Sequence, residues 1–264
     1  MLQIVLKQLF ITCMVALLFS AVVPSLAQQT SRQPEGGYTP EQILAKFIQT
    51  ETLVREALNQ HTFKRDVVLQ TIGRNGAVTG EYIRGSQFLF DDRGNRIERV
   101  EFHPRSTIRE MRITKEDIQD LAGAQLLGID IVEATKYTLT YVGPENLLGK
   151  RVYVLSVTPR IVPNPFRMSE RFFCGHIWVD AQTFQIIKIK GRVEPEGKQR
   201  FPVFETWRST VTTELLFPTS TEADDILRFS NRDVNYRIRV RYYDYKRFAA
   251  TVKVIEVDER NNEP

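Results

Sequence analysis

Apolar and polar residues first repeat along the chain with a helical period. Thr39 is followed by Pro40 and, three positions after the Thr, by Gln42, an arrangement that is typical of a capped helix start. The apolar residues that follow recur every three or four positions, at Ile43, Phe47, Val54 and Leu58. This spacing predicts one amphipathic helix that ends near Asn59, and its apolar stripe must be covered by another part of the fold.

From Thr62 the period shortens to two, the spacing of β-strands. A short strand at best is predicted over 107–113, a second helix over 114–121, and turns over 143–146 and 218–225. The main predicted strands are 66–72, 80–90, 96–103, 136–142, 150–159, 175–179, 184–191, 203–217, 226–230, 235–245 and 251–257. About ten strands with two helices and no β-α-β alternation predict a mainly β fold, a large antiparallel sheet that curls around covering helices.

The segment Gly175–Gly191 reads as a β-hairpin. Ile177 and Val179 share one face of its first strand, and Ile187 and Ile189 share one face of its second strand, with lysines opposite. Asp180 begins the turn, where its carboxylate can accept hydrogen bonds from backbone N–H groups two and three residues further on. We therefore interpret Asp180 as a turn-forming residue with no catalytic role.

The first 27 residues have the features of a secretory signal. Lys7 precedes a short apolar run, and small residues at Ser25 and Ala27 suit cleavage before Gln28. The alternative is a membrane anchor, but the run is shorter than the roughly 20 residues that a spanning helix needs. The residue before Cys13 is Thr12 where a lipid-attachment signal needs a small residue, so a lipoprotein is not predicted. The predicted organisation is a signal peptide over 1–27, a disordered leader over 28–37, one domain over 38–258 and a tail over 259–264.

Charge narrows the range of partners. The whole chain carries +4, and removal of Lys7 with no acid leaves +3 after cleavage. The basic residues alternate along strands instead of forming a block, so nucleic-acid binding is not favoured. The clearest example is Arg237, Arg239 and Arg241, which alternate with apolar residues and predict a strand with one wet face. No stretch after residue 27 is apolar enough to span a membrane.

Candidate chemistry is sparse. The three histidines, His61, His103 and His176, are far apart, and only Cys174 lies at ligand spacing from one of them, which is too few ligands for a zinc site. His61 is interpreted as a cation at the end of the helix and Cys174 as a small buried residue. The sequence contains no nucleophile elbow, zinc-protease helix, dinucleotide turn or phosphate loop. We therefore predict a protein that is not an enzyme and has no cofactor or metal.

Two further elements carry a resemblance to a known family. They are the strand Leu148–Pro159, which ends in a proline, and the Trp-x-Asp hairpin Gly175–Asp180 with Thr183. In this order they resemble the outer-membrane lipoprotein-sorting family of LolA/LolB type. Phe204–Trp207 and Arg241–Tyr245 are similar to elements of its longer, uncharacterised members. The chain is longer than the sorting proteins, so the resemblance is taken to imply a fold and a ligand class but no sorting role.

The resemblance implies a half-open antiparallel β-barrel with helices lying in its mouth as a lid. It also implies a periplasmic protein whose apolar concave face holds the acyl chains of lipids or lipoproteins, without catalytic residues. The helix at Ile43–Leu58 would cover that face when it is empty and move when it is loaded. The residues expected to line the cavity are Phe47, Tyr153, Leu155, Trp178, Ile187, Ile189, Phe204 and Trp207.

Two other hypotheses remain open. On the same fold, an envelope interaction or sensing module would bind a protein partner through the Arg237, Arg239 and Arg241 face and have no transport role. A hydrolase would use His176 with a nearby acid. Whether the concave face is a cavity or a filled core decides between a carrier and a structural domain, and composition alone does not answer that question.

Overall fold

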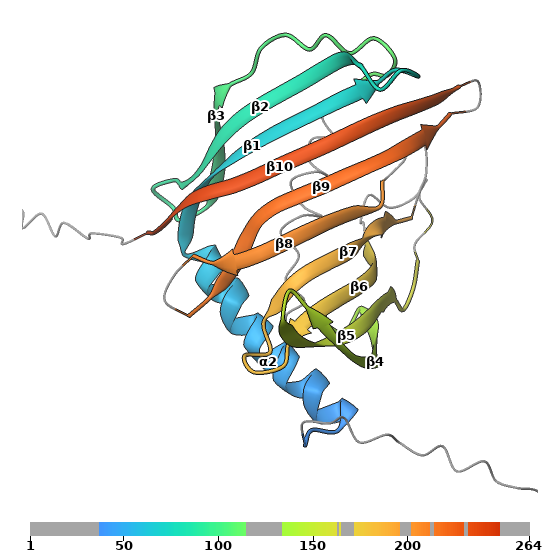
Figure 1. Ribbon diagram of the computed structural model, residues 1–264. Helices are drawn as coiled ribbons and strands as arrows, with labels where there is room; N and C mark the ends of the chain where they lie inside the picture. Colours follow the sequence, from blue (N-terminus) through green and yellow to red (C-terminus); the bar gives the residue numbers. More distant parts are fainter. Residues whose placement is uncertain are drawn as a thin grey trace, which may run out of the picture. The chain divides into compact units, whose positions relative to one another are not determined.

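Ten strands form one antiparallel sheet in the computed structural model (Figure 1). The structure describes residues 37–114, 134–162, 164, 172–195, 202–211, 214–229 and 232–248. The strands are β1 (His61–Ile72), β2 (Val78–Phe90), β3 (Arg96–Phe102), β4 (Tyr137–Leu147), β5 (Lys150–Pro159), β6 (Phe172–Asp180), β7 (Ile186–Glu194), β8 (Phe204–Thr210), β9 (Leu216–Arg228) and β10 (Asp233–Arg247). The predicted fold class, a curved antiparallel sheet with a covering helix, is confirmed for this part of the chain.

The sheet order is β3-β2-β1-β10-β9-β8-β7-β6-β5-β4. Strands β4 to β10 and strands β1 to β3 each follow one another in space, and β1 pairs with β10 to join the two groups. The pairing is long, from His61 opposite Arg247 to Ile72 opposite Asn235. Because β3 and β4 lie at opposite edges, the sheet is curved but open (Figure 1).

The helix α2 (Pro40–Asn59) begins and ends as the sequence predicts. The Thr39 hydroxyl accepts a hydrogen bond from the Gln42 backbone N–H at 3.3 Å, and the Gln42 side chain accepts one from the Thr39 N–H at 2.9 Å. This capping box satisfies N–H groups that a helix start otherwise leaves unpaired. At the other end the His61 ring nitrogen Nδ1 lies 2.6 Å from the Ala57 carbonyl oxygen, in agreement with the position predicted for this side chain.

Two predicted turns are wrong, and both residue ranges lie within strands. Gly143 follows a bulge at Val142 inside β4, and the chain reverses five residues later at Leu148 and Gly149, both of which have positive φ. The range 218–225 lies inside β9, where Pro218 sits at a register shift against β8. A proline is tolerated at a bulge because the regular ladder hydrogen bond is already interrupted there. The short strand suggested for 107–113 is not formed.

Several predicted elements lie outside the described residues. They are the first 36 residues with the signal segment and most of the leader, the second helix after Thr114, most of the loops 160–170 and 194–202, and the strand 251–257 with the tail. Within the ranges that the structure describes, no helix has the length and apolar character needed to cross a membrane.

Candidate ligand-binding face

The sheet has two chemically different faces. We call the side that packs against α2 the inner face and the other side the outer face. In β6, Ile177 and Val179 are fully buried on the inner face, whereas Trp178 between them lies on the outer face and is half-buried. The hairpin turn is built as predicted, because Asp180 Oδ1 accepts hydrogen bonds from the Gln182 N–H at 2.8 Å and the Thr183 N–H at 3.1 Å.

Strands β5 to β8 give the inner face an apolar half. Its side chains belong to one buried cluster with Ile43 and Phe47 of α2, which are both 0% exposed, and this cluster continues onto β1, β2 and β10. Five of the eight predicted cavity residues belong to this cluster: Phe47, Tyr153, Leu155, Ile189 and Phe204. Ile187 is also buried, but it lies at the register shift between β6 and β7 and outside the cluster. The structure therefore brings six of the eight residues to buried positions, five of them together.

A buried ion pair connects the helix to the inner face. Glu51 lies on the apolar side of α2, one turn after Phe47, and Arg208 lies on β8. Their side chains are 0% and 2% exposed, and Arg208 Nη1 donates to Glu51 Oε1 at 2.5 Å. A pair removed from water in this way depends on both partners, because removal of either one leaves the charge of the other buried without this ion pair.

Strands β1 to β3 give the inner face a charged group, which we call the Arg65 cluster: Arg65, Arg84, Ser86 and Glu98. Arg84 donates to both carboxylate oxygens of Glu98 at 3.0 Å, through Nε and Nη2. The Ser86 hydroxyl and Arg65 Nη2 both donate to Glu98 Oε1, at 2.6 and 3.1 Å. The Arg65 guanidinium also lies over the Phe88 ring, 4.7 Å from its centroid. The Glu98 carboxylate thus accepts hydrogen bonds from two guanidinium groups.

The Arg65 cluster predicts a dependence of stability on pH. Burial raises the pKa of Glu98, but hydrogen bonds from Arg84 and Ser86, with the charge on Arg65, outweigh it, and the pKa lies below its usual range. A depressed pKa contributes stability above the unfolded value of about 4.3, and that stability is lost as the pH falls through the folded value. Chemical denaturation should therefore show that Glu98→Gln is less stable than the wild type at neutral pH, with a difference that shrinks as the pH falls below about 4. A constant difference across this range would contradict the assignment.

Two of the predicted cavity residues, Trp178 and Trp207, lie on the outer face. They therefore do not join the predicted residues that cluster on the inner face. Trp178 and Trp207 are both neighbours of Lys188 across the β6–β7 and β7–β8 pairs. Lys188 Nζ lies 5.0 Å from the Trp178 ring centroid and 4.8 Å from that of Trp207. The indole N–H groups donate to Glu145 and Glu205. Both tryptophans alternate along their strands with buried residues. Because successive residues of a strand point to opposite faces, both indole rings lie on the outer face.

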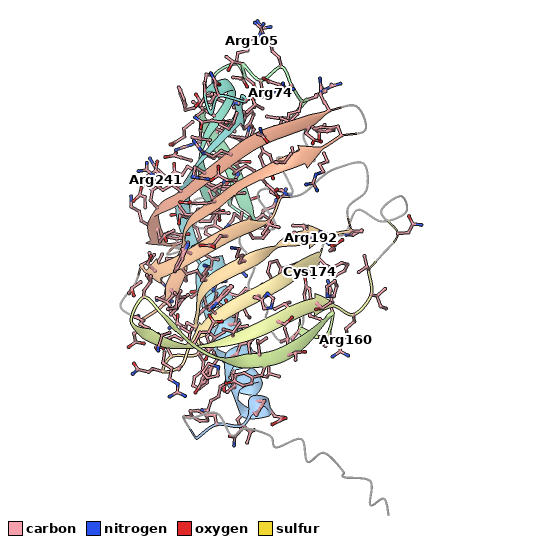
Figure 2. All side chains as sticks on the ribbon, turned by 45° about the vertical axis from the view of Figure 1, so that its right-hand side comes forward. Arg74, Arg105, Arg160, Cys174, Arg192 and Arg241 are labelled. Atoms are coloured by element: carbon pink, nitrogen blue, oxygen red, sulfur yellow. The ribbon has the colours of Figure 1, made fainter. Side chains whose placement is uncertain are left out.

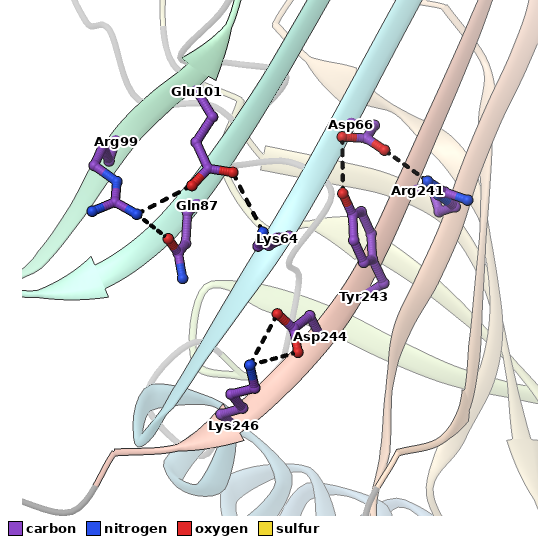
Figure 3. A network of polar contacts seen from close by, with 9 residues as sticks. All are labelled: Lys64, Asp66, Gln87, Arg99, Glu101, Arg241, Tyr243, Asp244 and Lys246. Carbon is purple, nitrogen blue, oxygen red and sulfur yellow. Dashed lines mark hydrogen bonds and ion pairs between the residues drawn. The ribbon is translucent and has the colours of Figure 1, made fainter.

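The three arginines of β10 lie on the outer face as predicted, and each has a carboxylate partner. Arg237 and Arg239 both contact Asp224, and Arg241 Nη2 lies 2.9 Å from Asp66 Oδ2. Figure 2 shows Arg241 pointing away from the sheet, and Figure 3 shows polar contacts among charged residues of β1, β3 and β10, with Gln87 of β2. This face is therefore a balanced charge network, which gives no support to a partner site built on arginine charge.

Cys174 and His176 also lie on the outer face, in line with Trp178. Cys174 is half-buried with a free thiol, opposite Arg192 on β7 (Figure 2), so its prediction as a buried residue is wrong. His176 is exposed, and its neighbours across the strand pairs are Ser156 and Lys190, neither of which is a carboxylate. This position offers no support for the hydrolase hypothesis, which needs an acid beside the imidazole.

Glu51, Arg65 and Arg208 were not among the residues predicted from the sequence. A signal for them exists, because each is charged but occupies an inward position of a regular pattern. Glu51 falls on the apolar stripe of α2, and Arg65 takes its place in the buried alternation from His61 to Thr71. Arg208 alternates with the buried Phe204 and Thr206. A charge at an inward position is costly unless it is paired, so such residues are candidates for function or for fold specificity.

Comparison with known proteins gives likenesses of structure only. No protein-family model and no curated protein matches the chain. A LolA superfamily protein from Nitrosomonas europaea is 15% identical, and the match covers 77% of this chain and 94% of that chain with a TM-score of 0.37. A putative outer membrane lipoprotein-sorting protein domain from Vibrio parahaemolyticus is 10% identical over 79% and 93%, with a TM-score of 0.38. A DUF1329 family protein from Desulfovibrio piger is 13% identical over 78% and 92%, with a TM-score of 0.37.

Proposed function

We propose that this protein is an exported, periplasmic, non-enzymatic binding protein for the acyl chains of lipids or lipoproteins. The acyl chain binds on the apolar half of the inner face, between β5 to β8 and α2. The observation that carries the proposal is the way in which one helix covers this face. Apolar side chains of α2 such as Ile43 and Phe47 pack into the cluster of the sheet, and the buried ion pair Glu51–Arg208 adds a polar connection.

The energetics of exchange favour an apolar ligand over a charged one. Side chains such as Leu155, Ile177 and Ile189 are almost fully buried with the helix in place, so an acyl chain must take over contacts that α2 makes. A chain that buries about ten methylene groups gains about 8 kcal/mol at roughly 0.8 kcal/mol each. That gain is comparable to the burial of a few apolar helix side chains, so helix and acyl chain can compete for the same surface. Displacement of α2 as one element would then accompany loading.

Export is proposed from the basic and apolar composition of the first 27 residues, which suits a cleaved secretory signal. With Cys174 as the only cysteine after that segment, the chain has no second thiol for an intrachain disulfide in an oxidising compartment. Both features suit a periplasmic carrier whose stability comes from a large core.

A matched pair of variants on α2 tests the proposal. Phe47 is 0% exposed and Leu53 is 57% exposed on the same helix. Phe47→Ala weakens the docking of α2, so the affinity for a fluorescent fatty acid should rise by about tenfold or more, since a weakening of 1.4 kcal/mol already corresponds to tenfold. Leu53→Ala should leave the affinity unchanged. The measurement is a fluorescence titration of protein from which co-purified lipid has been extracted.

Native mass spectrometry of protein isolated from the cell envelope gives the complementary result. We expect species of lipid mass that organic extraction removes. If the extracted wild type and Phe47→Ala both fail to bind the fatty acid while Phe47→Ala merely unfolds more easily, the inner face is an ordinary core and the proposal is wrong.

A further inference from the structure

Arg65 is a charged residue inside an otherwise alternating buried pattern. It lies on β1, between Phe63 and Val67 on the same face, and it is 1% exposed. Across the neighbouring strands it faces Ser86 on β2 and Tyr242 on β10. The chain therefore places a full positive charge on the inner face of the sheet, where most neighbours are apolar or aromatic.

The hydrogen-bonding capacity of this side chain is only partly used. Arg65 Nη2 donates to Glu98, but the buried Nε and Nη1 have no hydrogen-bond partner. Buried polar groups are normally satisfied, and an unmet donor costs about 1–3 kcal/mol, more when it is charged.

Glu98 has little capacity left for Arg65. Both of its oxygens already accept from Arg84, and Oε1 also accepts from the Ser86 hydroxyl. Counting charges in the Arg65 cluster gives two guanidinium groups against one carboxylate, a net charge of one plus. A second anionic oxygen group would satisfy the free Arg65 donors and neutralise this excess at the same time.

The cluster is continuous with the apolar half of the inner face. Between β1 and β7 lie β10, β9 and β8, so four strand spacings of about 4.8 Å separate Arg65 from Ile189 by about 19 Å along the sheet. The strands between them carry Thr206 and Thr221, whose hydroxyls lie 2.8 Å apart, and Tyr242 beside Arg65. An acyl chain with its anionic end at the Arg65 cluster would therefore cross β10 and β9 to reach β8, the nearest strand of the apolar half.

We propose that the Arg65 cluster binds the oxyanion, a carboxylate or phosphate, of an acyl ligand whose chain lies on the apolar half of the inner face. The position of the acyl chain rests on the proposed function, whereas the binding of the oxyanion rests on the Arg65 cluster alone. Arg65 Nε and Nη1 donate to the oxyanion, and Arg84 stays paired with Glu98.

Calorimetric titration of the lipid-extracted protein with three probes tests the inference. Laurate carries chain and charge, dodecanol carries the chain alone, and inorganic phosphate carries charge alone. Laurate should bind at least about tenfold more tightly than dodecanol, the effect of one charge-assisted hydrogen bond. Arg65→Met should abolish this preference and leave dodecanol binding unchanged. Arg241→Met removes a comparable arginine from an ion pair on the outer face and should change neither affinity.

The outcomes separate the anion site from the proposed function. Equal affinities for laurate and dodecanol that Arg65→Met does not alter would overturn the anion site and leave acyl binding intact. Phosphate binding that disappears in Arg65→Met, without binding of either acyl probe, would support the anion site and overturn acyl binding. Binding of none of the three probes overturns both.

A second variant keeps the test valid if Arg65→Met does not fold. Glu98→Gln removes the carboxylate that competes for Arg65, so the preference for laurate over dodecanol should increase severalfold. A preference that is unchanged or smaller in Glu98→Gln would contradict the proposal.

Discussion

Replacing Glu51 with Ala should destabilise the folded protein by about 3–5 kcal/mol, the cost of breaking a buried ion pair by removing one partner. Arg208 is 2% exposed and would keep its charge inside the interface between α2 and β8. Glu56→Ala is the matched control, because Glu56 is an exposed acid on the same helix and should change stability by no more than about 0.5 kcal/mol. Chemical denaturation of both variants gives the comparison.

A double variant distinguishes a lost ion pair from a lost helix contact. Replacing Glu51 with Leu together with Arg208 by Met removes both charges at similar volume, and such replacements are often neutral or stabilising. We expect the double variant to recover most of the stability that Glu51→Ala loses. A loss below about 1 kcal/mol in Glu51→Ala, the scale of an exposed ion pair, would contradict the buried arrangement.

Gly175→Ala should destabilise the protein by about 3 kcal/mol or more, at the upper end of overpacking effects. Gly175 and Gly191 are direct neighbours across β6 and β7, and the Phe173 ring lies over both. A Cβ on Gly175 would collide with the Lys190 carbonyl oxygen and would lie 2.6 Å from the Gly191 Cα and 2.8 Å from Phe173 Cζ. Two of these atoms belong to the backbone and cannot move aside without disturbing the strand pair.

Gly85 provides the control, because it is also a strand glycine but its surroundings leave room for a Cβ. A Cβ there would meet its nearest atoms at 3.4 and 3.5 Å, which is ordinary contact. Gly85→Ala should therefore be close to neutral in thermal denaturation. Similar losses of stability in Gly85→Ala and Gly175→Ala would show that the close approach of Gly175 and Gly191 is not what matters.

Much of the fold follows from local patterns in the sequence. The capping box at Thr39 and the Asp180 turn depend on residues within a few positions of each other, and both are formed. The β10 alternation also predicts its outward arginines. The two wrong turn predictions have a common cause, which is that strand pairing overrides a local turn signal. Gly143 and Pro218 are accommodated by bulges in strands that are held by partners further away in sequence than a turn spans.

The candidate site was only partly predictable because it depends on faces and pairings. The family resemblance predicts Trp178 and Trp207 in the cavity, although alternation with Ile177 and Val179 or with Phe204 and Thr206 places them on the outer face. The partners Glu51 and Arg208 are 157 positions apart and meet only through the docking of α2. The approach of Arg65 to Glu98 likewise requires the β1-β2-β3 order of the sheet.

The most direct test of the proposed function is to map where an acyl ligand binds. Laurate with a photoreactive diazirine on its chain can be cross-linked to the lipid-extracted protein, and the modified residues identified by mass spectrometry of peptides. We expect modification of α2 near Phe47 and of inner-face residues such as Leu155 and Ile189, reduced by an excess of unlabelled laurate. Modification concentrated on outer-face residues such as Trp178 and Trp207, or modification that unlabelled laurate does not reduce, would contradict an acyl site on the inner face.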